Sequence, residues 1–195
     1  MVPILTFTLS IFFFSNLIAS PKESSKELRK KINQLLRDNK ETESIPYLEK
    51  YLEDHESELY FKMLHAKALL FRNDLELPKP GDDVYTKKEK RRRIRSNFIL
   101  AARLLEEHVS HYGRVRPRDP LLGRWIFIWG VSEWFSGKKL KAIGLFQKAV
   151  KQDYTLTESY YNSAAIYESL GQYKDAEVQW NKYVKAEKEL NKPDE

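Results

Sequence analysis

Apolar side chains recur at intervals of three and four residues along most of the chain. Leu28, Ile32 and Leu35 form one such stripe, and Ile45, Leu48 and Leu52 form the next. This spacing places the apolar side chains on one face of an α-helix, whereas a half-buried strand would alternate with a period of two. No convincing period-two segment occurs, and glycine and proline are rare. The pattern therefore predicts an all-α protein of short helices joined by short connections.

Helix start signals support this assignment. A serine or threonine followed three residues later by glutamate can form a capping box, in which each residue satisfies a free backbone N–H of the other. Asp119-Pro120 offers an N-cap followed by proline at the first helical position. We expect helices to begin near these sites, at Ser24 with Glu27, Thr86 with Glu89, Thr155 with Glu158, and at Asp119.

The sequence also repeats itself at an interval of 34 residues. When residues 123–156 are written above 157–190, small and aromatic positions coincide. A small residue in the first helix allows a close approach of its partner helix, and a glycine after that helix adopts the left-handed C-cap conformation. The matched pairs are Gly130 with Ala164, Gly137 with Gly171, Ala142 with Ala176, and Phe146 with Trp180.

These positions resemble the tetratricopeptide repeat (TPR) family. Residues 142–153 resemble a second helix of such a repeat, and residues 159–176 resemble a first helix, its turn and the next helix start. Ser163, Tyr183 and the absence of a closing proline depart from the family pattern. The matching residues are Tyr160, Ala164, Tyr167, Gly171, Tyr173, Ala176 and Trp180.

The resemblance implies an α-solenoid of antiparallel helix pairs, wound as a right-handed superhelix. We expect one domain over residues 21–195, with repeats at about 25–58, 59–115, 123–156 and 157–190. The second repeat is interrupted by an insertion at 74–90, where Pro78, Pro80 and Gly81 predict a loop. The helix after this loop is expected to run from Thr86 to about Tyr112, roughly 40 Å, so that its first three turns project past its neighbours.

Positive charge is concentrated in this helix. The chain has a net charge of +6, yet residues 87–118 alone hold eleven Lys or Arg and three acidic residues, a balance of +8. Such a segment can bind an anionic surface, lipid headgroups, nucleic acid or an acidic protein, or it can be a solvated helix start. Nucleic acid is the less expected partner, because residues 87–95 contain no interleaved aromatic residue. The candidate patch is Lys87, Lys88, Lys90, Arg91, Arg92, Arg93 and Arg95.

Residues 123–137 are apolar nearly all round, so this helix must be covered on several sides. In the TPR family one side of the first helix lines a concave groove, which would suit an apolar peptide or an amphipathic helix of a partner protein. The alternative is that the loop at 74–85, or the curvature of the array, covers these rings as core. The resemblance implies groove positions at Met63, Lys67, Phe71, Arg124, Phe127, Val131, Trp134, Phe135, Tyr161 and Glu168.

The first twenty residues carry no charged side chain and end in the small residues Ala19 and Ser20. This pattern predicts a signal peptide and an exported protein, periplasmic or secreted, in a bacterial-type envelope. The alternative is an uncleaved membrane anchor formed by residues 1–20. The basic residues that follow favour the anchor, whereas several polar residues within the segment weaken it.

Candidate catalytic chemistry is sparse. The chain has no cysteine, which excludes disulfides, thiolate zinc ligands and thiol catalysis. No glycine-rich phosphate motif occurs, and His108 and His111 form at most a two-ligand metal pair. We therefore expect no cofactor, no metal and no catalysis, and a scaffold or adaptor that binds a protein or peptide. Self-association is a further possibility, through Tyr183, Val184 and Leu190 of a final helix that no later repeat covers.

Overall fold

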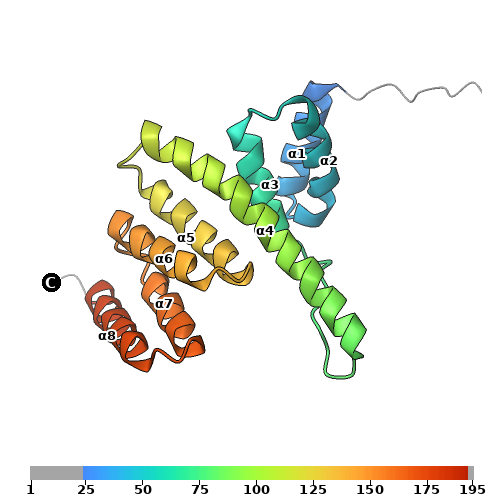
Figure 1. Cartoon of the computed structure of the whole chain (residues 1–195). Coiled ribbons are helices and arrows are strands. Elements are labelled where there is room, and N and C mark those ends of the chain that lie inside the picture. Colours follow the sequence, from blue (N-terminus) through green and yellow to red (C-terminus); the bar gives the residue numbers. More distant parts are fainter. Residues whose placement is uncertain (1–23, 193–195) are drawn as a thin grey trace, which may run out of the picture.

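The computed structural model describes residues 24–192, and this part of the chain contains eight helices and no strand. Each helix packs against the next one along the chain, which gives a row of antiparallel pairs (Figure 1). The all-α prediction is confirmed; the expected signal peptide or anchor at 1–20 lies outside the described residues. The helices are α1 (Ser25–Arg37), α2 (Glu41–Asp54), α3 (Leu59–Phe71), α4 (Val84–Val115), α5 (Pro120–Phe135), α6 (Lys139–Gln152), α7 (Glu158–Ser169) and α8 (Tyr173–Leu190).

The start signals were right in two places and wrong in two. Ser24 and Glu27 form the complete capping box of α1, and the Asp119 carboxylate accepts the Leu121 N–H at the start of α5. The helix expected at Thr86 begins two residues earlier, because the Asp83 carboxylate accepts the Thr86 N–H. The box predicted at Thr155 does not form, since the hydroxyl and N–H of Thr155 both bind Asp153.

Left-handed residues close three of the turns between paired helices. Gly137 and Gly171 have φ of 95° and 73°, as the repeat predicted, and Asn39 takes the same role after α1 with φ of 54°. The next N–H after each of them reaches back to a carbonyl in the last turn of the preceding helix, at 2.8 to 2.9 Å. These bonds satisfy carbonyls that would otherwise lack partners at the helix ends. The three turns therefore share one backbone geometry.

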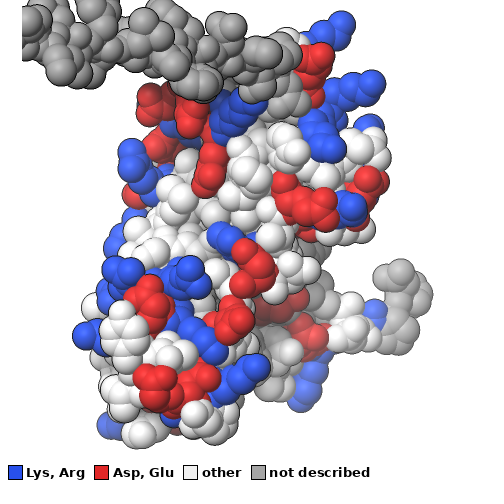
Figure 2. All heavy atoms as spheres, turned by 90° about the vertical axis from the view of Figure 1, so that its right-hand side faces the viewer, with Lys and Arg blue, Asp and Glu red and all other residues white. Residues whose placement is uncertain are grey.

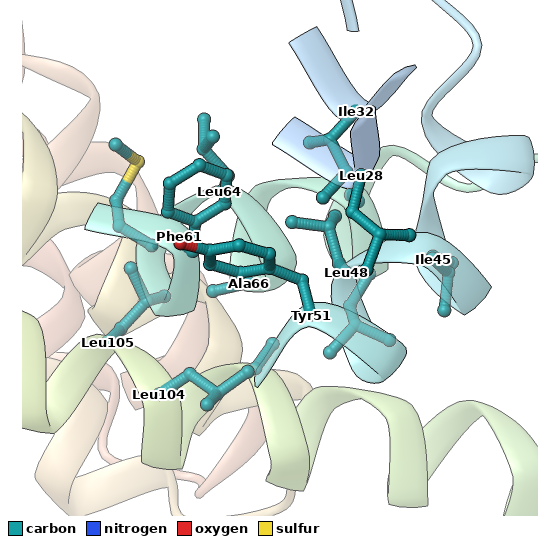
Figure 3. Close-up of a cluster of buried hydrophobic side chains, with 14 residues drawn as sticks. Leu28, Ile32, Ile45, Leu48, Tyr51, Phe61, Leu64, Ala66, Leu104 and Leu105 are labelled. Atoms are coloured by element: carbon teal, nitrogen blue, oxygen red, sulfur yellow. The ribbon is translucent and has the colours of Figure 1, made fainter. Parts of the chain in front are cut away.

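A large apolar cluster joins the first four helices (Figure 3). Tyr51 of α2 is fully buried, its ring lies 4.3 Å from that of Phe61, and Leu105 of α4 closes the cluster. Two smaller clusters continue the core through α5, α6 and α7. In one of them Gly130 lies so close to the Phe146 ring that a Cβ would meet it at 2.8 Å. The predicted role of Gly130 as a close-packing position is thus confirmed.

Helix α4 is the longest element, with 32 residues. Its first buried residue is Asn97, so the thirteen residues from Val84 to Ser96, about 20 Å of helix, precede the buried part of α4. Figure 1 shows this projection at the lower right, with the loop of residues 72–83 beside it. The helix is longer at both ends than the sequence predicted. Within residues 24–192 we find no helix that combines the length and apolar character of a membrane span.

Candidate functional site

Residues 95–98 of α4 lie between the C-terminal ends of α3 and α5. The Asn97 side-chain amide donates to the Leu69 carbonyl of α3 at 2.6 Å, and the Arg95 Nε donates to the Ser136 carbonyl after α5 at 2.9 Å. Carbonyls in the last turn of a helix have no partner within that helix, so these side chains supply the missing donors. One stretch of α4 therefore fixes the ends of two first helices.

Both of these helices end in an exposed phenylalanine. Phe71 is the last residue of α3 and is 60% exposed, and Phe135 is the last residue of α5 and is 52% exposed. The Phe135 ring stacks on Phe98 of α4 at 4.8 Å and on Trp134 at 5.4 Å between centroids. Both were predicted as groove residues. We call Phe71, Phe98 and Phe135 the phenylalanine surface, in which the ring contact is that of Phe98 with Phe135.

Other predicted groove positions of α3 and α5 are mostly packed. Met63 is buried among the first four helices, so its side chain is part of the core. Phe127, Val131 and Trp134 are half-buried, and they pack against the cluster that joins α6 and α7. These three side chains are therefore partly covered by α6 and α7.

The remaining groove positions are polar or lie on α7. The Lys67 ammonium faces the Glu41 carboxylate of α2 at 3.9 Å, and Arg124 is exposed. Tyr161 is 47% exposed and meets the Trp180 ring edge-on at 4.9 Å. The exposed Glu168 accepts the Trp180 indole N–H at 2.8 Å. Arg124, Tyr161 and Glu168 are therefore accessible, and Lys67 is partly so. Lys67 and Arg124 lie on α3 and α5, the helices that carry the phenylalanine surface, whereas Tyr161 and Glu168 lie on α7.

Sequence reasoning missed a buried acid beside this surface. Glu133 of α5 is 1% exposed, and its carboxylate contacts the Lys141 ammonium at 2.7 Å, Lys138 at 3.3 Å and the Trp129 indole N–H at 3.1 Å. Burial alone would raise the pKa of Glu133, but the hydrogen bonds from Lys141 and Lys138 outweigh it and hold the pKa below its usual range. A signal was present, since Glu133 is the one acidic residue in 123–137.

The basic patch is partly neutralised by the loop beside it. Lys90, with a side chain only 15% exposed, contacts Glu76 and Asp82 at 3.0 Å each, and Lys87 donates to the Pro80 carbonyl at 2.7 Å. In the lower part of Figure 2, where the first turns of α4 lie, red and blue side chains are interspersed. The other patch residues, Lys88, Arg91, Arg92, Arg93 and Arg95, are exposed. Two of them also make contacts, since Arg92 pairs with Glu89 and Arg95 donates to the Ser136 carbonyl.

A pocket of about 650 Å³ opens between α3, the 72–83 loop and α4. Arg72 forms two 2.6 Å hydrogen bonds to Asp74 and a third, at 3.2 Å, to the Asn97 amide oxygen. The Arg72 hydrogen bonds lower the pKa of Asp74, so this carboxylate stays ionised. Charged, polar and apolar side chains line the pocket, and they are Glu49, Leu69, Arg72, Asp74, Leu75, Glu76, Lys90, Arg92, Arg93, Ile94, Ser96, Asn97 and Leu100.

Two further features of the sequence concern His108 and α8. The suggested metal pair is split, because His108 is buried against Trp125 and Tyr112 while His111 is exposed. On α8 the predicted self-association residues Val184 and Leu190 are 48% and 41% exposed. Tyr183 instead packs edge-on to Tyr161 at 5.7 Å. Self-association through α8 stays a prediction.

Comparison with known proteins supports the fold. No protein-family model matches the chain, and no curated protein matches it. Among solved structures, "Crystal structure of MamA" aligns over 86% of this chain and 81% of that chain, with a TM-score of 0.56 and 14% identity. "MamA 41-end from Desulfovibrio magneticus RS-1" aligns over 86% and 97%, with a TM-score of 0.44 and 18% identity.

A third solved structure is "Crystal structure of YrrB: a TPR protein with an unusual peptide-binding site". It aligns over 85% of this chain and 88% of that chain, with a TM-score of 0.37 and 16% identity. At these identities the likeness concerns the fold alone, and the first structure carries it. Together with the eight helices of residues 24–192, it shows that this chain has a TPR-like fold, an all-α solenoid of antiparallel helix pairs.

Proposed function

We propose that this protein is a non-catalytic scaffold that binds a partner protein or peptide across the phenylalanine surface, in the concave groove expected of a TPR-like solenoid. The observation that carries the proposal is that α3 and α5 each end in a phenylalanine more than half exposed, on either side of the same stretch of α4. Exposed aromatic side chains on a rigid support are the usual anchors of protein interfaces.

The surface is held rigidly enough to bind without large rearrangement. Arg95 and Asn97 fix the two helix ends, and the stack of Phe135 on Phe98 restricts the ring that is offered to a partner. Binding then costs less free energy, because little of the surface has to become ordered when a partner binds. We infer that the bound segment is short and apolar, with two bulky side chains that contact Phe71 and Phe135.

The proposed setting is the bacterial cell envelope. The support is the uncharged apolar stretch of residues 1–20, which ends in small residues as a signal peptide does. An alkaline phosphatase fusion that carries residues 1–24 tests the location directly. Phosphatase activity requires export, so we expect activity from this fusion, and an inactive fusion would contradict the proposed location.

The binding function is tested with peptides selected from a displayed library against the full chain. We expect the Phe71→Ala, Phe135→Ala double variant to bind the selected peptides at least about tenfold more weakly, since each ring loses contact area on truncation. The matched control is Leu140→Ala with Tyr173→Ala, which removes two side chains of 71% and 72% exposure elsewhere. Peptides that bind both double variants as tightly as the parent chain would contradict the proposal.

A further inference from the structure

Exposed apolar side chains lie at the N-terminal end of the projecting part of α4. Val84 and Tyr85, the first two residues of the helix, are 85% and 78% exposed, and Leu77 in the adjoining loop is 71% exposed. Single exposed apolar residues are common on protein surfaces. Here Val84 and Tyr85 begin a stretch of about 20 Å of helix that precedes the first buried residue of α4, and Leu77 lies in the loop beside this stretch. We call Leu77, Val84 and Tyr85 the apolar tip.

Basic side chains follow the tip directly. One helical turn and two turns after Val84, on the same face of α4, lie Lys88 and Arg91, both exposed. Over residues 72–96 as a whole, nine Lys or Arg stand against five Asp or Glu, which leaves a net charge of +4. The loop acids Glu76 and Asp82 pair with Lys90, so they do not neutralise Lys88 and Arg91 directly.

We propose that this projection docks on the surface of an anionic phospholipid bilayer, with the apolar tip in the headgroup region and Lys88 and Arg91 against the lipid phosphates. Peripheral membrane binding combines buried apolar area with attraction between basic side chains and anionic lipids. Tyrosine favours the boundary between headgroups and acyl chains, because its ring is apolar and its hydroxyl is polar. This contact is separate from the phenylalanine surface and leaves it open to a partner.

A nucleic acid fits the tip less well. It would pair with the basic side chains, but a polyphosphate chain makes no use of the exposed aliphatic side chains of Leu77 and Val84. A bilayer uses both features at once, since an apolar layer lies directly beneath its charged surface. Charge complementarity and the apolar tip therefore point to the same occupant.

The first test measures where the tip lies when the full chain meets vesicles. The chain has no cysteine, so Val84→Cys provides a single site for a polarity-sensitive fluorophore, and Leu140→Cys, at a side chain of 71% exposure, provides the control. With vesicles of phosphatidylcholine and phosphatidylglycerol we expect a blue shift and higher intensity at position 84 and no change at 140. Equal changes at both positions, or none at 84 while the protein co-floats with the vesicles, would overturn the proposal.

The second test separates the two contributions. In flotation with the same vesicles, Lys88→Gln with Arg91→Gln should weaken partitioning about 30-fold. The loss should be smaller at high salt, because salt screens the attraction between the basic side chains and the lipids. Val84→Ser with Tyr85→Ser should weaken it about tenfold. Lys174→Gln with Lys182→Gln makes the same charge change on α8 and should have little effect. The proposal is wrong if the Val84→Ser, Tyr85→Ser variant floats like the parent chain. It is also wrong if the α8 double variant loses as much vesicle binding as the Lys88→Gln, Arg91→Gln variant, because net charge alone would then govern binding.

Discussion

The Glu133 carboxylate of α5 and the Lys141 ammonium of α6 lie 2.7 Å apart, with Glu133 almost fully shielded from water and Lys141 about one-third exposed. The Lys141 ammonium also lies 4.7 Å from the centre of the Trp129 ring and 3.1 Å from Glu106 of α4. A single lysine therefore connects three helices next to the phenylalanine surface. The ionised form of Glu133 depends on this contact, because burial alone would favour the neutral acid.

Replacing Lys141 by methionine leaves the buried carboxylate with Lys138 and Trp129 as partners. Breaking a buried ion pair on one side costs about 3–5 kcal/mol in general, but solvent reaches Lys141 and Lys138 remains. We therefore expect Lys141→Met to lower the free energy of unfolding by about 2 kcal/mol in urea titrations, whereas Lys148→Met on the exposed side of α6 changes it by less than about 0.5 kcal/mol. Adding Glu133→Gln should recover part of the loss, and a double variant less stable than Lys141→Met would refute the coupling.

Two glycines in paired helices should respond to alanine in opposite ways. At Gly130 a Cβ would meet the Phe146 ring at 2.8 to 2.9 Å, whereas at Gly144 a Cβ would meet no side chain and no other helix within 4 Å. Overpacking should make Gly130→Ala less stable by about 2 kcal/mol despite the better helix propensity. Gly144→Ala should be more stable by about 0.5–1 kcal/mol. Thermal unfolding of both variants checks the difference, and equal shifts in Tm would contradict the close packing of α5 on α6.

Lowering the pH should destabilise the fold over the pH range in which His65 and His108 are protonated in the unfolded chain but stay neutral when buried in the folded protein. Burial lowers the pKa of His65 to about 4, with a smaller contribution from the Arg72 charge, and burial also lowers the pKa of His108. Below an unfolded pKa near 6.5 the unfolded state binds protons first, so stability is complete above about pH 6.5 and falls between there and pH 4. His65 alone contributes about 2 kcal/mol of loss from pH 7.5 to pH 5.

Urea titrations at the two pH values measure this loss. His65→Gln should remove most of its share of the pH dependence, while His111→Gln, at an exposed position, should leave the dependence unchanged. The Glu49 carboxylate, 3.7 Å from the His65 ring, favours the protonated form and works against the effect of burial. A parent chain equally stable at pH 5 and pH 7.5 would show that this carboxylate prevails over burial.

The fold was largely predictable because its signals are local. Apolar spacing, the capping box at Ser24 and the left-handed positions Gly137 and Gly171 each depend on residues close in sequence. The misjudged helix starts have the same local character, since Asp83 and Asp153 compete with Thr86 and Thr155 for the role of acceptor. A threonine two or three residues after an aspartate gives an ambiguous start signal, because the aspartate carboxylate is the stronger acceptor.

The candidate site was only partly predictable, since it depends on contacts between distant residues. Phe71 and Phe135 were found through the repeat register, but the same register also selected Phe127 and Trp134, which pack against the next helices. The register gives a helix face, whereas the exposure of a ring depends on how closely α6 and α7 approach. The contact of Arg95 with Ser136 spans 41 positions, and no local pattern distinguishes Arg95 from the other basic residues around it.

The most direct test of the proposed binding surface is site-specific photocrosslinking to a selected peptide. Because the chain has no cysteine, Phe71→Cys, Phe135→Cys and Leu140→Cys each carry one photoreactive label, and a label at Val84→Cys marks the apolar tip. We predict that the peptide crosslinks from positions 71 and 135 and not from 140 or 84. Crosslinks from 140 or 84 with none from 71 and 135 would contradict the claim that partners bind at the ends of α3 and α5.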